Sequence, residues 1–358
     1  MTANLITGQR LRRPDNAWRS PSESIMKTVD RAAARLLGET AGWLVKSSQP
    51  AVRYYALTDL LEFREDDVEV QNVRAQIPRM GWAHDLLASQ KPGGYWEAHE
   101  PRTVKEWVSF LRFPLYDSSI WKGIVLSDLG LTATDPRIRR LADRIFEYKL
   151  HLSSEVNLFT EEVCIVGNVA RMMTRFGYGD DRRVRKLYEW MIEDQREDGG
   201  WNCATDRPGT LDCWEALAAF ATIPKPKRSA AMERAVERGA EFYLERKLFE
   251  EGRRYAPWFR FHYPTHYFYD VLVGLDMLTS LGYAGDPRLQ PALQILRDKR
   301  RIDGTWALDR VHPDEGRRGG KGTDATRVRS FAVERPGEPS HWITLTALRV
   351  LKRVEDAS

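Results

Sequence analysis

Residues 195–201 read Gln-Arg-Glu-Asp-Gly-Gly-Trp, a stretch that closes a predicted helix and opens a turn. Its skeleton, Gln-x-x-x-Gly-x-Trp, recurs at residues 90–96 and, with Arg in place of Gln, at residues 300–306. The three tryptophans are 105 residues apart (201 − 96 and 306 − 201). Equal spacing of a rare residue in one turn context indicates that the chain is an array of structural repeats.

Apolar helical segments alternate with charged ones along the chain, and no run has a convincing two-residue strand period. Two charged segments begin with Asp-Pro-Arg, at residues 135–137 and 286–288, where Asp suits the N-cap and Pro the first helical position. About six such pairs predict an all-α fold, an α/α toroid of six helical hairpins with inner and outer rings. An open solenoid is the alternative. We expect a loose arm over residues 1–21 and a single toroid domain over residues 22–358.

Composition bounds the protein class. The chain has 358 residues, 42% of them hydrophobic, with 12 Trp, which supports a substantial core. Acids nearly balance bases at a net charge of +4, so no nucleic-acid partner is indicated. No stretch approaches the roughly 18 apolar residues of a transmembrane helix, and peripheral membrane contact is left open. Three cysteines form no zinc-finger pattern, and their odd count favours a reducing, cytoplasmic location.

The repeated turns resemble the repeat motif of squalene-hopene and oxidosqualene cyclases, which protein prenyltransferase β-subunits share loosely. The complete motif has an aromatic and an aliphatic residue before the Gln, and Trp190-Met191 stands there. The resemblance covers residues 51–353 and implies a divergent, bacterial-type member of the terpenoid cyclase and prenyltransferase α/α-toroid superfamily. It implies a hydrophobic, isoprenoid ligand in a central cavity. The Gln, Gly and Trp themselves have structural roles: tying a helix end, allowing a tight turn and covering the joint.

Candidate ligand-binding residues are the polar and aromatic groups near the starts of the apolar helices, where such a toroid faces its cavity. Aromatic faces suit an isoprenoid because they stabilise developing carbocations. Core packing is the alternative for each of them. The predicted ligand-binding set is Tyr55, Trp121, Glu162, Trp214, His266, Tyr269, His341 and Trp342.

The chemistry of the family is only partly spelled out. The Asp-x-Asp-Asp motif of proton-initiated cyclases is absent, which leaves a lone Asp212 or Asp270 as the candidate catalytic acid. Prenyltransferases hold zinc with an Asp-x-Cys pair and a distant His. Here Asp212 and Cys213 are adjacent, so zinc at Asp212, Cys213 and His341 is a secondary alternative to a site without a cofactor. The acidic run at residues 64–67 is interpreted as a solvated turn rather than a magnesium site.

Three functions remain open on the sequence. The first is an isoprenoid-binding protein, catalytic as a cyclase or prenyltransferase or not catalytic at all. The second is a binding or interaction scaffold that lacks chemistry. The third is a carbohydrate-active enzyme, since glycosidases and polysaccharide lyases also use rings of paired helices, with two carboxyls across a polar groove. The Gly- and Arg-rich segment 311–339 is either a lid or a solvated insertion.

Overall fold

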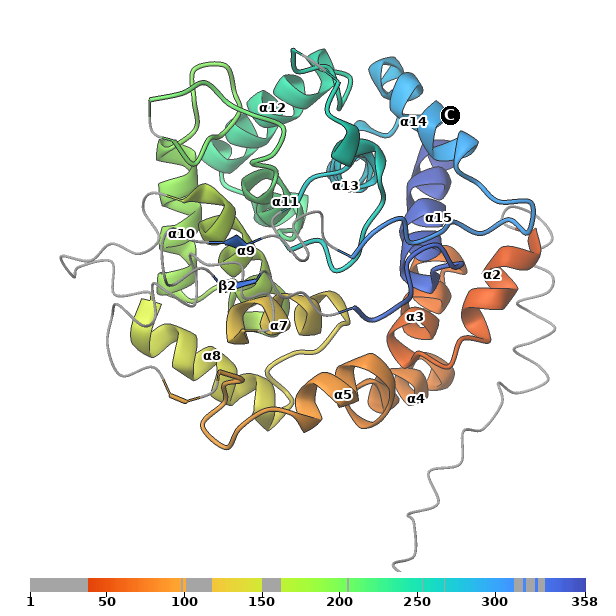
Figure 1. Ribbon diagram of the computed structural model, residues 1–358. Coiled ribbons are helices and arrows are strands. Elements are labelled where there is room, and N and C mark those ends of the chain that lie inside the picture. Colours follow the sequence, from red (N-terminus) through yellow and green to blue (C-terminus); the bar gives the residue numbers. More distant parts are fainter. Residues whose placement is uncertain are drawn as a thin grey trace, which may run out of the picture.

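The structure is a computed structural model that describes residues 38–97, 99–100, 118–149, 162–204, 206–252, 254–266, 268–311, 318–319, 326–327 and 332–358. The predicted N-terminal arm and most of segment 311–339 lie outside these residues. The described chain forms an α/α toroid, so the predicted fold class is confirmed (Figure 1).

The inner ring is made of the predicted apolar helices, of which α3, α7, α9 and α11 bury nearly every residue, whereas the last turn of α15 is exposed. In chain order they are α3 (Pro50–Tyr55) with its extension η1 (Ala56–Leu60), α7 (Ser119–Asp128), α9 (Val163–Met173) with η3 (Thr174–Tyr178), α11 (Glu215–Ala221), α13 (Val271–Leu278) with η6 (Thr279–Tyr283), and α15 (His341–Asp356).

The outer ring consists of amphipathic helices that bury one face against the inner ring. They are α2 (Gly38–Val45), α4 (Val68–Gln76), α5 (Gly81–Ala88), α8 (Pro136–Lys149), α10 (Arg182–Glu193), α12 (Ala230–Glu245) and α14 (Gln290–Asp298). Short 3₁₀ turns are η2 (Ile77–Arg79), η4 (Lys225–Lys227), η5 (Ala256–Phe259) and η7 (Pro287–Leu289), and a two-residue antiparallel ribbon pairs β1 (Arg318–Gly319) with β2 (Thr326–Arg327).

The helix starts follow the local sequence signals. Asp135 and Asp286, which open the two Asp-Pro-Arg segments, accept hydrogen bonds from the backbone N–H two residues on, at 2.8 and 2.9 Å. Ser340 caps α15 by accepting from the N–H of Ile343 at 3.0 Å. Each cap satisfies a backbone donor that the first helical turn leaves without a partner.

The repeated turns are the joints between hairpins. The indole Nε1 of each motif tryptophan donates to the carbonyl ten residues earlier, at 2.9 Å for Trp96 and 2.8 Å for Trp201 and Trp306. Gln195 Nε2 donates to the carbonyls of Gly199 (2.8 Å) and Ala235 (2.9 Å), the latter on α12. The motif therefore links one hairpin to the next through backbone groups.

Contacts between the last and first inner helices close the ring. Arg349 on α15 donates from Nε to Asp59 Oδ2 at 2.7 Å, and Lys352 Nζ lies 2.6 Å from Glu62 Oε1. Because each pair joins residues 290 positions apart, the array closes on itself and the open solenoid is wrong (Figure 1).

Candidate functional site

The centre of the ring holds a cavity of about 350 Å³. Among the described residues its wall carries four aspartates and four arginines: Asp59, Asp128, Asp270, Asp276, Arg171, Arg175, Arg349 and Arg353. Four large aromatic side chains complete it: Tyr55, Trp214, Tyr263 and Trp342. Small ligands commonly bind in concave sites of this kind, where apolar walls carry a few converging polar groups.

The ends of the inner helices present most of the charged groups. Helices α3, α9 and α13 continue into the short segments η1, η3 and η6 near the cavity, and the left-handed glycines Gly177 and Gly282 end the helix in η3 and η6. At three helix ends the spacing is the same: a residue that lines the cavity lies two positions before the glycine that ends the helix. These residues are Asp128 before Gly130, Arg175 before Gly177 and Ser280 before Gly282.

Three of the arginines are paired with aspartates across helix boundaries. Arg349 and Arg353 are both on α15. Arg349 contacts Asp59 Oδ2 from Nε (2.7 Å) and Nη2 (2.6 Å), and Arg353 Nη1 donates to Asp276 Oδ1 at 2.7 Å. Arg175 forms the third pair with Asp128, whose side chain is 9% exposed. The pairs satisfy groups that would be costly to bury alone, and they hold the charged atoms in fixed positions on the wall.

Asp276 is kept ionised by the arginines around it. Burial alone would raise the pKa of this carboxyl, but the charges of Arg353, Arg349 and Arg175 outweigh burial and lower it below its usual value. Its side chain is 38% exposed although it lies deep within the ring, because it borders the cavity. A carboxylate of this kind accepts hydrogen bonds from ligand hydroxyls at neutral pH.

Arg171 differs from the other cavity arginines because its close partner is neutral. It donates from Nη2 to Asn168 Oδ1 at 3.0 Å, while its Nη1 is 3.8 Å from Asp128. Its guanidinium carbon lies 5.1 Å from the centre of the Trp214 ring. Burial lowers the pKa of Arg171, and its Nε has no hydrogen-bond partner in the part of the chain that the structure describes. Arg171 thus brings a weakly neutralised cation to the aromatic wall.

Four of the residues predicted from the sequence line the cavity: Tyr55, Trp214, Asp270 and Trp342. Asp270 is 1% exposed, and its two oxygens are occupied. Oδ1 accepts from the N–H of Val273 at 2.9 Å, capping α13, and Oδ2 lies 2.7 Å from His262 Nδ1. His262 Nε2 faces the Thr265 carbonyl at 3.2 Å. The pair is a buried hydrogen-bonded unit at the cavity edge.

The other predicted residues lie outside the cavity wall. Trp121 and His266 are buried edge-to-face, 5.7 Å between ring centres, and Tyr269 donates to the Leu248 carbonyl at 2.8 Å. Asp212 accepts from Trp258 Nε1 at 2.7 Å. Three further placements complete the set: Glu162 stands at the N-cap of α9, His341 stacks on Trp43 at 4.0 Å, and Cys213 lies 3.8 Å from Cys203 between the sulfur atoms.

The described residues contain no group of three or more His, Cys, Asp and Glu side chains close enough to hold a metal ion. Asp212, Cys213 and His341 are therefore not gathered into a zinc site. The acidic run at residues 64–67 forms an exposed turn, as predicted, in which Arg64 binds Asp66 at 2.8 Å. Within the described residues no helix combines the length and apolarity needed to cross a membrane.

Sequence reasoning missed most of the charged wall because it searched the starts of the apolar helices rather than their ends. The signal was present. Charged residues interrupt otherwise apolar segments in their last turns: Asp59 in Leu-Thr-Asp-Leu-Leu, Asp128 in Leu-Ser-Asp-Leu-Gly, Arg171 and Arg175 in Ala-Arg-Met-Met-Thr-Arg-Phe-Gly, and Asp276 in Gly-Leu-Asp-Met-Leu. A charge on a buried face needs a partner or a ligand, and such residues mark the lining of the ring.

Comparison with known proteins found no matching family model and no matching curated protein. Among solved structures, a glycosyl hydrolase family 88 protein from Bacteroides vulgatus matches at a TM-score of 0.45 and 13% identity, covering 93% of this chain and 99% of that one. A polysaccharide lyase matches at a TM-score of 0.46 and 12% identity, covering 93% and 98%. At such identities and scores neither likeness assigns an activity to this chain.

The expected relationship to terpenoid cyclases and prenyltransferases is wrong. The matching structures bear the names of carbohydrate-active enzymes, and none of those reported is a terpenoid cyclase. The physical reason is that the repeated turns bond backbone groups and so describe how hairpins join. The isoprenoid ligand has no support either, because four arginines and four aspartates line the cavity and a hydrocarbon offers no hydrogen bond to the polar groups that face it.

Proposed function

We propose that the protein is a carbohydrate-active α/α-toroid protein that binds a saccharide in its central cavity. The observation that carries the proposal is the wall itself, which combines three Arg–Asp pairs with aromatic side chains. A sugar has apolar C–H faces and a rim of hydroxyl groups. The faces pack on aromatic rings, and the hydroxyls exchange hydrogen bonds with carboxylates and guanidinium groups.

The aromatic platform of the proposed site is formed by Trp342 with Tyr263 and Tyr55. The rings of Trp342 and Tyr263 are stacked at 4.6 Å, and Tyr55 meets Trp342 edge-on at 6.1 Å. The Tyr263 hydroxyl has no hydrogen-bond partner among the described residues. In the proposed complex ionised Asp276 accepts a hydrogen bond from a sugar hydroxyl.

Of the two catalytic acids expected from the sequence, we retain Asp270 in a positioning role. Its carboxylate orients His262, which also borders the cavity. Asp212 has no part in the proposed site. The described wall also offers Asp128 and Asp276 as the carboxyl pair that glycoside chemistry uses, one as acid and one as base or nucleophile. We further propose a cytoplasmic location, because all three cysteines are free thiols.

Calorimetric titration of the full chain tests the proposal, with a panel of neutral and uronic-acid-containing oligosaccharides. We expect at least one saccharide to bind, and Trp342→Ala to weaken it about tenfold or more, since losing an aromatic anchor typically costs over 1 kcal/mol. The matched control is Trp190→Ala, a partly buried tryptophan of outer helix α10 away from the cavity. Binding that Trp342→Ala leaves unchanged, or no binding across the panel, contradicts the proposal.

A non-catalytic scaffold is the second candidate, favoured by the three Arg–Asp pairs that already satisfy much of the wall. Incubating the bound saccharide with the protein and analysing its chain length separates the two. Shortened products that disappear in the Asp128→Asn and Asp276→Asn variants support catalysis, whereas an intact saccharide supports binding alone.

A further inference from the structure

All three cysteines of the chain meet at one place outside the cavity wall. Cys164 lies in the first turn of α9, Cys203 follows the turn tryptophan Trp201, and Cys213 precedes α11. Cys203 Sγ is 3.3 Å from Cys164 Sγ and 3.8 Å from Cys213 Sγ. Because the three come from separate segments, the fold rather than local sequence assembles this thiol cluster.

The cluster favours one thiolate. Cys203 is the central sulfur, and its hydrogen bonds with Cys164 and Cys213 lower its pKa to about 3. The same hydrogen bond with Cys203, together with burial, raises the pKa of Cys164 and of Cys213. The thiolate is the reactive form of cysteine, so the arrangement gives one nucleophile flanked by two protonated thiols.

The two neighbours of Cys203 differ in solvent exposure. Cys203 and Cys164 are both partly exposed, whereas Cys213 is 5% exposed. A small oxidant therefore reaches Cys203 with Cys164 beside it, and their sulfurs need to approach only from 3.3 Å to the bonding distance of about 2.05 Å.

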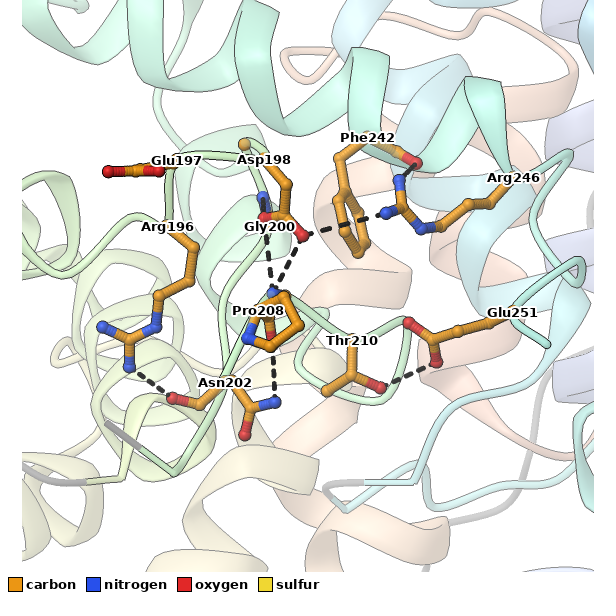
Figure 2. Close-up of polar contacts among 12 residues, drawn as sticks. Arg196, Glu197, Asp198, Gly200, Asn202, Pro208, Thr210, Phe242, Arg246 and Glu251 are labelled. Atoms are coloured by element: carbon orange, nitrogen blue, oxygen red, sulfur yellow. Dashed lines mark hydrogen bonds and ion pairs between the residues drawn. The ribbon is translucent and has the colours of Figure 1, made fainter. Parts of the chain in front are cut away.

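The loop that carries Cys203 is tied at both ends by polar contacts (Figure 2). Asn202 Nδ2 donates to the Pro208 carbonyl at 2.7 Å, and Arg196 Nη2 donates to the Asn202 carbonyl at 2.9 Å. At the far end Thr210 Oγ1 donates to Glu251 Oε2 at 2.8 Å. These contacts restrict the backbone beside Cys203 and so keep its sulfur next to that of Cys164.

Two carboxyl groups near the cluster, those of Glu215 and Asp194, have raised pKa values. Glu215 is fully buried, neither of its oxygens has a hydrogen-bond partner among the described residues, and burial raises its pKa well above the usual value. Burial, opposed by Arg196 and assisted by Cys203, raises the pKa of Asp194 to about 6. Arg196 itself lies 3.3 Å from Asp194 and bonds the loop.

We propose that the cluster is a peroxide-sensing oxidation site in which Cys203 is the nucleophile and Cys164 the resolving thiol. The Cys203 thiolate attacks one oxygen of hydrogen peroxide or an alkyl hydroperoxide, the O–O bond breaks, and the other oxygen leaves as water or an alcohol after taking a proton. The resulting sulfenic acid is then attacked by Cys164, which forms the Cys164–Cys203 disulfide and releases water. Both electrons go to the peroxide, and a cellular thiol reverses the step by exchange.

Peptide mapping by mass spectrometry after treating the full chain with hydrogen peroxide tests this proposal. We expect a Cys164–Cys203 disulfide and the loss of two hydrogen atoms. Cys213→Ser, the matched control, keeps that disulfide. Cys164→Ser either accumulates a sulfenic acid that dimedone traps at Cys203 or joins Cys203 to Cys213. Cys203→Ser forms no disulfide. A Cys164–Cys213 product, or equal oxidation of the Cys203→Ser variant, overturns the proposal.

A second measurement, independent of disulfide formation, is the pH dependence of Cys203 alkylation by iodoacetamide. An ordinary thiol loses reactivity about tenfold for each pH unit below its pKa of about 8.5. We expect the rate at Cys203 to stay nearly constant from pH 7 to pH 5. A tenfold fall per unit over that range would show a protonated thiol and overturn the assignment of the nucleophile. Neither experiment depends on saccharide binding.

Discussion

The joints between hairpins and the wall of the cavity are built from different kinds of contact. At the joints, side chains bond backbone carbonyls: each motif tryptophan bonds the carbonyl ten residues before it, and Gln195 bonds one 40 residues on. In the cavity, side chains bond other side chains, and one pair spans 290 residues. A contact within a repeated motif can be predicted from the sequence. An ion pair between residues far apart in sequence can be recognised only once the folded ring is known.

The largest expected effect concerns the joint. Trp201 is fully buried, and Gly239 of α12 lies so close that an added Cβ would come within 2.9 Å of the indole. We expect Trp201→Ala to lower the free energy of unfolding by about 3–5 kcal/mol, because it opens a cavity and frees the Met191 carbonyl. Urea denaturation measures the loss. Trp190→Ala, partly buried on the neighbouring helix, should cost clearly less; equal losses would mean that the joint has no special role.

Alanine variants at Gly199 and Gly177 distinguish the cost of a left-handed backbone from the cost of steric crowding. Gly199 has φ +86°, and a Cβ there would lie 2.4 Å from the Arg238 carbonyl oxygen. Gly177 has φ +103° with no atom within 4 Å of such a Cβ. Gly177→Ala should lose about 1–2 kcal/mol from left-handed strain alone. Gly199→Ala should lose about 1–3 kcal/mol more, since the α12 backbone must shift. Similar unfolding free energies for the two variants would exclude close approach as the reason for Gly199.

The same contrast explains what the sequence could predict. The fold was predictable because Gly199 and Trp201 belong to a turn whose skeleton repeats along the chain at a constant spacing. The site was harder because Asp59 and Arg349 look like isolated charges until ring closure brings them together. The resemblance to terpenoid cyclases failed for the same reason: it rested on joints, which related and unrelated rings can share. Asp270 was found as a helix cap at the cavity edge, whereas Asp276, a charge in the last turn of an apolar helix, was missed because the search covered the helix starts.

The smallest effect tests the cavity pairs as elements of ring closure. Asp59→Asn removes the charge opposite Arg349, whose side chain is only 12% exposed, and should lower the free energy of unfolding by about 1–3 kcal/mol. Hydrogen exchange should quicken in α3 and α15 and stay unchanged in α9 and α11. The control is Glu62→Gln, which breaks the second closing pair at a carboxylate that is 73% exposed. It should cost less than about 1 kcal/mol because water screens it. Faster exchange around the whole ring in Asp59→Asn would mean that the Asp59–Arg349 pair stabilises the whole fold. The distinction between the joints and the cavity pairs would then not hold.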